Sequence, residues 1–257
     1  MQRYLRAIAM AVTLGSISSS YHLPAFGQAT HQMHSYPSPN MGSMGGMEHK
    51  NMGSMGTPPG KFHFLSDKEH SALRFYNQGL DKLADKDYEG AIASFTQVLK
   101  LTPQYDMAYF NRGNAQKQLG RYQAAIDDYS KALETNPTFT YLYYYRGNLR
   151  EELGDIKGAI ADYNEAIASY PEEGTGYSNR GFARYKLGDI QGAIEDLNAA
   201  ITVNPGNAGA YFNRATIYAN LGKHSKAIAD YQTAKSLYLE QGMKSEYLRT
   251  TLAIAAL

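Results

Sequence analysis

The sequence lacks several features that would point to common functions. It contains no cysteine, which excludes disulfides, thiol-linked lipid attachment and a cysteine nucleophile, so stability must come from packing. Its 25 basic and 24 acidic residues are mixed along the chain and leave a net charge of +1. A nucleic-acid-binding protein normally carries a basic face. We therefore expect the partners to be proteins or peptides, and no nucleic acid.

Long apolar runs are also missing. The apolar stretch near the start, Ala7–Ile17, follows Arg3 and Arg6 and is shorter than the roughly 20 residues that span a bilayer. A basic head, a short apolar middle and a small-residue exit predict a signal peptide over residues 1–27, the alternative being an uncleaved amphipathic anchor. We expect an exported protein that is periplasmic, secreted or located in the thylakoid lumen, without stable membrane insertion after cleavage.

Residues 28–60 have almost no large aliphatic side chains, and Gly, Ser, Pro and Asn dominate. Such a segment cannot bury enough surface to offset its ordering entropy, so we expect a disordered linker. Most of the ten methionines of the chain fall here, several at a spacing of three, together with histidines. Thioethers suit Cu(I) and imidazoles suit Cu(II). The candidate metal ligands are His31, Met33, His34, Met41, Met44, Met47, His49, Met52 and Met55.

Two interpretations of this linker stay open. It is similar to the Met-rich copper-binding segments of secreted bacterial copper-handling proteins, which implies copper or silver binding. A flexible tether of biased composition would have the same sequence features. No other cofactor is indicated.

The rest of the chain is a repeat with a period of 34 residues. Its five units are residues 72–105, 106–139, 140–173, 174–207 and 208–241. Numbered 1 to 34 within each unit, position 4 is aromatic, position 8 is small, position 20 is always Ala, and position 32 is Pro in the first four units. Apolar positions follow helical spacing, so each unit is predicted to be two amphipathic helices.

The ends of the predicted helices have their own signals. Position 15 is Gly120, Gly154, Gly188 or Gly222 in the last four units, which suits the left-handed conformation after a helix. The first unit has Lys86 there, so its turn is expected to differ. Ser66 and Glu69 have the spacing of a capping box before the first helix.

This pattern resembles the tetratricopeptide repeat (TPR) family, because aromatic, small, Ala and Pro positions recur in fixed phase. The resemblance implies an all-α solenoid of five helix-turn-helix repeats over 61–257, closed by a capping helix at about 243–257. It also implies that the first helices of the units line a concave groove that binds a peptide.

Positions 7 and 23 change together within the chain. Units two to five carry Arg at position 7 and Asp at position 23, whereas the first unit has Gln78 and Ser94. Joint change suggests contact, so we predict structural ion pairs, the alternative being that the arginines face a ligand. The pairs are Arg112 with Asp128, Arg146 with Asp162, Arg180 with Asp196, and Arg214 with Asp230.

A second stripe of the first helices carries aromatic and Asn side chains opposite the predicted packing face. In the family this stripe lines the groove, and Asn suits the main chain of an extended peptide. The predicted groove residues are Tyr76, Asn77, Phe110, Asn111, Asn114, Tyr141, Tyr144, Tyr145, Asn148, Asn179, Phe182, Tyr185, Phe212 and Asn213. The alternative is that the Asn side chains bridge neighbouring helices and that some Tyr rings pack between units.

The family's clamp for a free carboxylate end is not expected here. Tyr76, Tyr141 and Tyr145 stand where that clamp requires positive charges. The chain also lacks a Gly-rich phosphate loop and zinc-type His spacing, so we do not expect an enzyme. We expect a non-catalytic scaffold or assembly factor that binds an internal peptide segment, the alternative being a copper-handling accessory protein.

Overall fold

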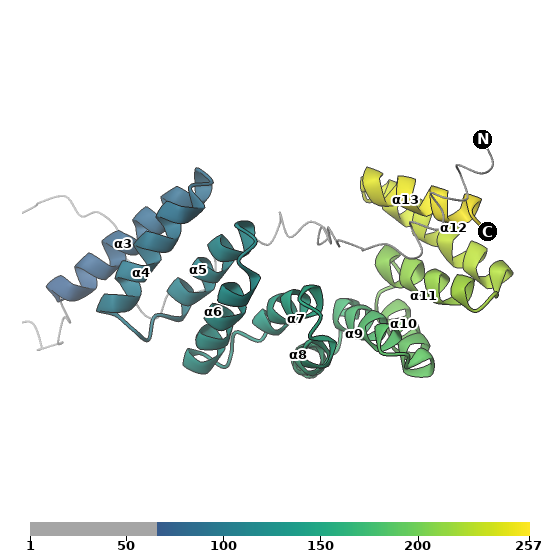
Figure 1. Cartoon of the computed structure of the whole chain (residues 1–257), viewed down its shortest axis with the longest axis horizontal. Helices are drawn as coiled ribbons and strands as arrows, with labels where there is room; N and C mark the ends of the chain where they lie inside the picture. Colours follow the sequence, from purple (N-terminus) through teal and green to yellow (C-terminus); the bar gives the residue numbers. More distant parts are fainter. Residues whose placement is uncertain (1–65) are drawn as a thin grey trace, which may run out of the picture. The chain divides into compact units, whose positions relative to one another are not determined.

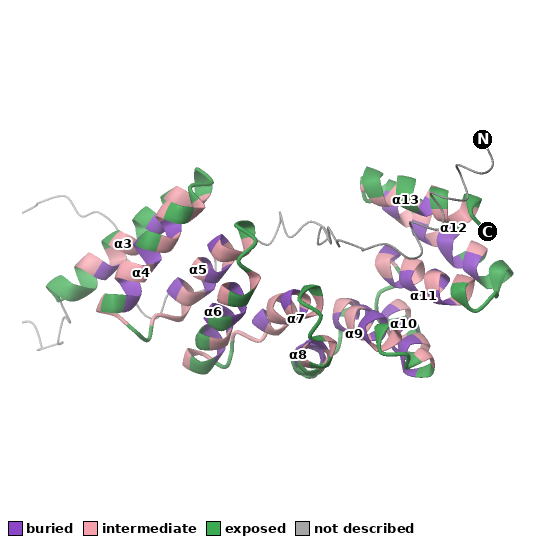
Figure 2. Ribbon diagram, viewed as in Figure 1, coloured by how far each residue is buried: buried purple, intermediate pink, exposed green. Residues whose placement is uncertain are grey.

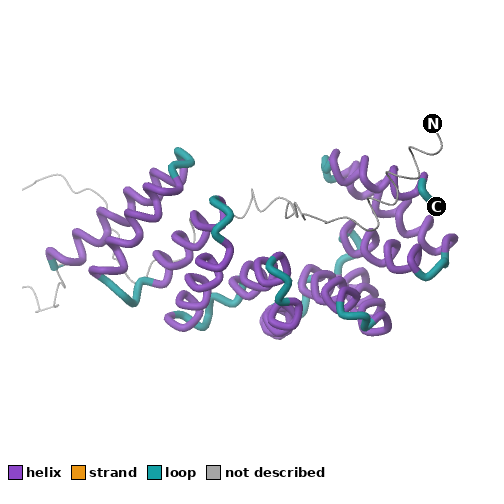
Figure 3. Tube along the Cα trace, in the orientation of Figure 1, coloured by secondary structure: helices purple, strands orange, loops and turns teal. Residues whose placement is uncertain are grey.

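The computed structural model describes residues 66–257. Within this range every regular element is an α-helix, joined by short turns (Figures 1 and 3). The helices are α3 (Asp67–Ala84), α4 (Tyr88–Leu101), α5 (Asp106–Gln118), α6 (Tyr122–Thr135), α7 (Leu142–Glu152), α8 (Ile156–Ser169), α9 (Gly174–Lys186), α10 (Ile190–Val203), α11 (Ala208–Asn220), α12 (His224–Glu240) and α13 (Lys244–Ala255). The predicted all-α repeat fold is confirmed.

Consecutive helices pair as the 34-residue period requires. Each unit is one hairpin of a first helix (helix A: α3, α5, α7, α9, α11) and a second helix (helix B: α4, α6, α8, α10, α12). Helix B of each unit also packs on helix A of the next. Stacking matters because one hairpin cannot bury its own apolar face.

Helix ends follow the local sequence. The Ser66 side chain and Glu69 form the predicted capping box at the start of α3. The four position-15 glycines all have positive φ, as expected of residues that follow a helix. Lys86 takes the same left-handed conformation, with φ +61°. The expectation of a different first turn is therefore wrong in this respect, because the hairpin geometry overrides the preference of lysine.

The core lies between the paired helices, where small residues let the two backbones approach (Figure 2). The position-20 alanines are fully buried, from Ala91 to Ala227. A Cβ on Gly113 would lie 2.8 Å from the Tyr129 ring, and one on Gly147 would lie 2.8 Å from the Tyr163 ring. In these two units the tyrosine ring at position 24 thus fills the space that glycine leaves at position 8.

The last unit ends differently from the others. Leu239 replaces the position-32 proline, and α12 continues to Glu240. Helix α13 then packs on α12, with Tyr247 and Met243 against a cluster that contains buried Tyr238. Among residues 66–257, no helix is both long and apolar enough to cross a membrane.

Candidate functional site

All four predicted Arg–Asp pairs are present. The closest N–O distance between guanidinium and carboxylate is 2.7 Å in each pair. Two guanidinium nitrogens donate to each carboxylate, which holds the planar groups in register. The aspartates are buried, Asp162 with 2% of its surface exposed. Hydrogen bonds to Asp128 raise the pKa of Arg112 above its usual value.

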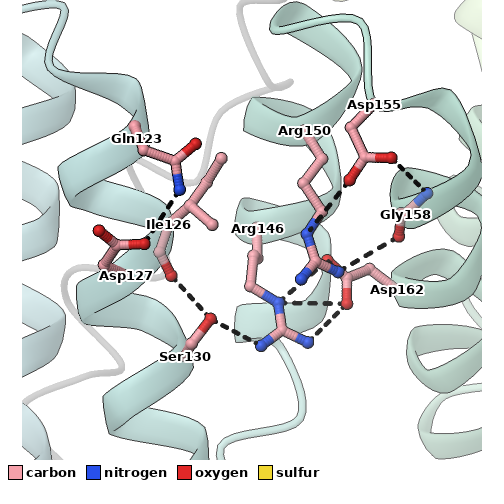
Figure 4. A network of polar contacts seen from close by, with 9 residues as sticks. All are labelled: Gln123, Ile126, Asp127, Ser130, Arg146, Arg150, Asp155, Gly158 and Asp162. Carbon is pink, nitrogen blue, oxygen red and sulfur yellow. Dashed lines mark hydrogen bonds and ion pairs between the residues drawn. The ribbon is translucent and has the colours of Figure 1, made fainter.

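Each of these arginines also reaches the preceding unit, which the sequence reasoning missed. Nη1 donates to the position-25 side chain of the previous helix B: Arg112 to Thr96, Arg146 to Ser130, Arg180 to Asn164 and Arg214 to Asn198. Figure 4 shows Arg146 between Ser130 and Asp162. We call these four pairs with their position-25 contacts the Arg–Asp ladder. The first unit has no preceding hairpin among the described residues, and it carries Gln78 and Ser94 at positions 7 and 23.

Two further arginines join this network. Arg150 donates to Asp162 at 2.9 Å, and Arg184 lies 2.9 Å from Asp196. Both stand at position 11, one helical turn after the predicted arginine, so the same spacing argument could have found them. The cations of the Arg–Asp ladder thus have partners inside the chain, which favours the structural role over ligand contact.

The predicted groove stripe is only partly open. Phe110 and Phe182 are buried, with 4% and 6% of their surface exposed, and Asn111 and Asn213 are buried too. The expectation that the rings of this stripe are not needed in the core is wrong for Phe110 and Phe182. Phe110 contacts the buried Tyr129 ring, so helix B of the same unit covers it.

Several other stripe residues bridge neighbouring units, as the alternative interpretation expected. Asn111 donates to the Tyr76 hydroxyl, and Asn179 donates to the side-chain Oδ1 atom of Asn148. The Tyr144 hydroxyl lies in the space beside Gly176 in α9, and burial raises the pKa of Tyr144. These contacts tie helices A to one another across unit boundaries.

A spacing of 35 residues recurs in these bridges. It joins Asn111 to Tyr76, Lys186 to Glu151, and Asn220 to Tyr185. The donor is thus one position further along its helix than the acceptor is in the preceding unit. This offset depends on how adjacent helices are rotated against each other, which the sequence period does not reveal.

The remaining predicted groove residues differ in their surroundings. The Phe212 ring is covered by the Arg249 guanidinium of α13, 4.1 Å from its centroid. The Tyr185 ring packs against Phe182, and its hydroxyl accepts from Asn220. Asn77 and its neighbour Leu80 are exposed on α3.

The junction of α5 and α7 contains the largest aromatic group of the stripe. Tyr145 lies 6.1 Å from Phe110 and 6.2 Å from Tyr141, centroid to centroid. Tyr145 is only half-buried, and Asn114 on α5 is half-buried as well. The junction therefore offers rings and an amide at a partly open surface.

No metal centre is formed within residues 66–257, where no group of three or more His, Asp or Glu side chains could hold an ion. The candidate ligands His31, Met33, His34, Met41, Met44, Met47, His49, Met52 and Met55 lie outside the described residues. The same holds for the predicted signal peptide and for the linker at 28–60.

Comparison with known families agrees with this architecture. Family models described as Tetratricopeptide repeat match residues 107–139, 141–173 and 208–241, and one described as TPR repeat matches 79–120 and 181–222. The chain belongs to the tetratricopeptide repeat family. No functionally curated protein sequence matches it. The TPR fold is typically a non-catalytic interaction scaffold, which supports protein or peptide partners for this TPR chain.

Solved TPR structures share its fold at low sequence identity. A crystal structure of MamA protein is 22% identical with a TM-score of 0.61, over 68% of this chain and 95% of that one. MamA from Desulfovibrio magneticus RS-1 is 19% identical with a TM-score of 0.62, over 68% and 98%. YrrB, described as a TPR protein with an unusual peptide-binding site, is 22% identical with a TM-score of 0.58, over 70% and 91%.

Proposed function

We propose that this TPR protein is a non-catalytic scaffold that holds an extended segment of a partner protein against its helices A. The observation that carries the proposal is the half-open junction of α5 and α7. There the Tyr145 ring and the Asn114 amide remain half-buried. A half-buried ring contributes binding free energy when a partner covers its exposed part. The Asn side-chain amide can form hydrogen bonds with the main chain of the partner. The unusual peptide-binding site of YrrB, which has a similar fold, supports this function.

Some of the predicted groove residues are too buried to contact such a segment. Phe110, Phe182, Asn111 and Asn213 are covered by the chain itself. The contact area we propose is therefore formed by five half-buried or exposed residues on or next to the first three helices A. These are Asn77, Leu80, Asn114, Tyr141 and Tyr145.

Photo-crosslinking tests this surface. Peptides selected by display of random sequences on the full chain would carry a benzophenone residue, and the crosslinked positions would be mapped by mass spectrometry. We expect crosslinks on α3, α5 and α7 near Asn77, Asn114 and Tyr145. Crosslinks confined to the exposed faces of α4, α6 and α8 would refute the assignment.

We also propose export of the protein, from the signal-like residues 1–27. The copper-handling accessory role stays a second proposal, favoured by the spaced methionines and histidines of residues 28–60. A Cu(I) competition titration would compare the full chain with a variant whose methionines at 41, 44, 47, 52 and 55 are replaced by leucine. Equal affinities would rule out the methionine site.

A further inference from the structure

Lys117, near the end of α5, is a cation without an anionic partner in the described part of the chain. Its ammonium makes no ion pair or hydrogen bond with any residue of that range, and its Nζ lies 5.4 Å from the Tyr145 ring centroid. The residue is half-buried, and this burial lowers the pKa of Lys117. A carboxylate placed beside the ammonium would offset that loss of solvation.

The next junction of helices A shows how a lysine in this region is otherwise paired. Lys186 on α9, at position 13 of its unit, contacts Glu151, at position 12 on α7, at 2.8 Å. At the junction of α5 and α7, position 12 of the earlier helix is the basic Lys117 and position 13 of the later helix is the acidic Glu152. The signs of the two charges are therefore reversed relative to Glu151 and Lys186. The Lys117 ammonium lies beside the Tyr145 ring.

A second donor lies one helical turn before the lysine. The Asn114 Oδ1 atom accepts a hydrogen bond of 2.8 Å from the buried Tyr129 hydroxyl, which fixes the orientation of the amide. Its Nδ2 atom has no partner among residues 66–257. Because residues three apart share a helix face, the Asn114 amide and the Lys117 ammonium lie on the same side of α5.

The junction of α5 and α7 also differs from the next junction in its aromatic residue. Position 6 is Tyr145 here, whereas it is Asn179 in the next unit, where the amide donates to Asn148. The tyrosine at this position leaves Asn114 without that second contact and places a ring beside the lysine. Tyr145 in turn packs on Tyr129 at 6.0 Å. An ionic contact gains strength in such a partly desolvated setting.

We propose that Lys117, Asn114 and Tyr145 form a subsite for the carboxylate of an Asp or Glu side chain within the bound segment. The subsite rests on the proposed peptide-binding function and specifies the partner as an acidic, internal segment. The ammonium pairs with the carboxylate, the Asn114 amide donates to it, and the Tyr145 ring packs on its aliphatic carbons. A charge-assisted contact of this kind is worth about tenfold in affinity or more.

Peptide pairs test the subsite on the full chain. Peptides selected by random display would be synthesised with their acidic residue and with the matching Asn or Gln, each with an amidated and a free carboxyl end. Their dissociation constants would be measured by fluorescence anisotropy for the native chain, Lys117→Gln, and the exposed control Lys100→Gln on α4. Thermal unfolding of each variant checks that it is folded.

We expect the native chain and Lys100→Gln to bind the acidic peptide at least about tenfold more tightly than its amide form. Lys117→Gln should reduce this ratio to below about twofold and leave the affinity for the amide form unchanged. The subsite would be overturned if Lys117→Gln kept the same affinity ratio between the acidic peptide and its amide form. It would also be overturned if the preference required a free carboxyl end, or if the selected peptides contained no acidic residue. Failure of the scaffold function would differ, because then neither form of any peptide would crosslink to helices A.

Discussion

Two adjacent aspartates on α6 provide a matched test of the Arg–Asp ladder. Asp128 is buried and accepts two hydrogen bonds from Arg112, whereas Asp127 is exposed and accepts one from Gln123. Removing one partner of a buried pair leaves an uncompensated charge and costs about 3–5 kcal/mol. The Arg112 side chain is 20% exposed, so the lower end of that range applies to Asp128→Ala. For Asp127→Ala we expect a change of at most about 0.5 kcal/mol.

Asp162 extends this series because two arginines share it. Arg146 and Arg150 both donate to its carboxylate, and its side chain is 2% exposed. Asp162→Ala leaves the Arg146 guanidinium without a carboxylate and the Arg150 guanidinium with only that of Asp155, 3.9 Å away. We therefore expect a loss of about 4 kcal/mol, larger than that of Asp128→Ala. The free energies of unfolding would come from guanidinium chloride titrations followed by circular dichroism. They would be fitted with separate repeat and interface terms, since repeat arrays unfold as coupled neighbours.

A double-mutant cycle separates the coupling energy between Arg112 and Asp128 from the destabilisation that each substitution causes by itself. Arg112→Met combined with Asp128→Ala should cost about 2 kcal/mol less than the sum of the single changes, because the unpaired charge is then absent. Equal losses for Asp128→Ala and Asp127→Ala, or a coupling energy near zero, would refute the structural role of the ladder.

Three further changes follow from the structure. Lys86→Gly should raise the free energy of unfolding by about 0.5–1 kcal/mol, since Lys86 has φ +61° and glycine adopts that conformation without strain; a loss of stability in the same titration would contradict this. Gly147→Ala should cost about 1–2 kcal/mol, because its Cβ would lie 2.8 Å from the Tyr163 ring, and an unchanged midpoint would show that the ring moves freely. Burial raises the pKa of Tyr129, and that of Tyr238 to about 12, so the stability they provide is present below pH 10 and lost as pH rises. Tyr238 should contribute a fall of about 1.4 kcal/mol per pH unit between pH 10 and 12, and a melting temperature that is constant over that range would contradict it.

The fold could be predicted because its signals are local and repeated. Helical spacing, the position-15 glycines and the position-32 prolines recur in phase, so each unit supports the same interpretation. The Arg–Asp pairs were also predictable, since Gln78 and Ser94 replace both partners in the first unit. Such joint changes within one chain serve as a substitute for an alignment.

The candidate site was harder to predict because it depends on contacts between units. The helical spacing places Phe110 on the stripe, but only the rotation of α5 against α6 brings its ring onto Tyr129. The 35-residue bridges depend on the same rotation, so Asn111 and Tyr76 could not be paired in advance. Lys86 shows the converse, a residue whose local preference the hairpin overrides.

Binding of a segment along helices A is the central claim, and amide chemical-shift mapping tests it most directly. The isotope-labelled full chain would be titrated with a display-selected peptide and followed by nuclear magnetic resonance. The largest shifts are expected at Asn114 and Lys117 on α5, at Tyr141 just before α7, and at Tyr145 on α7. Shifts concentrated on α6 and α8, with α5 and α7 unchanged, would contradict the claim.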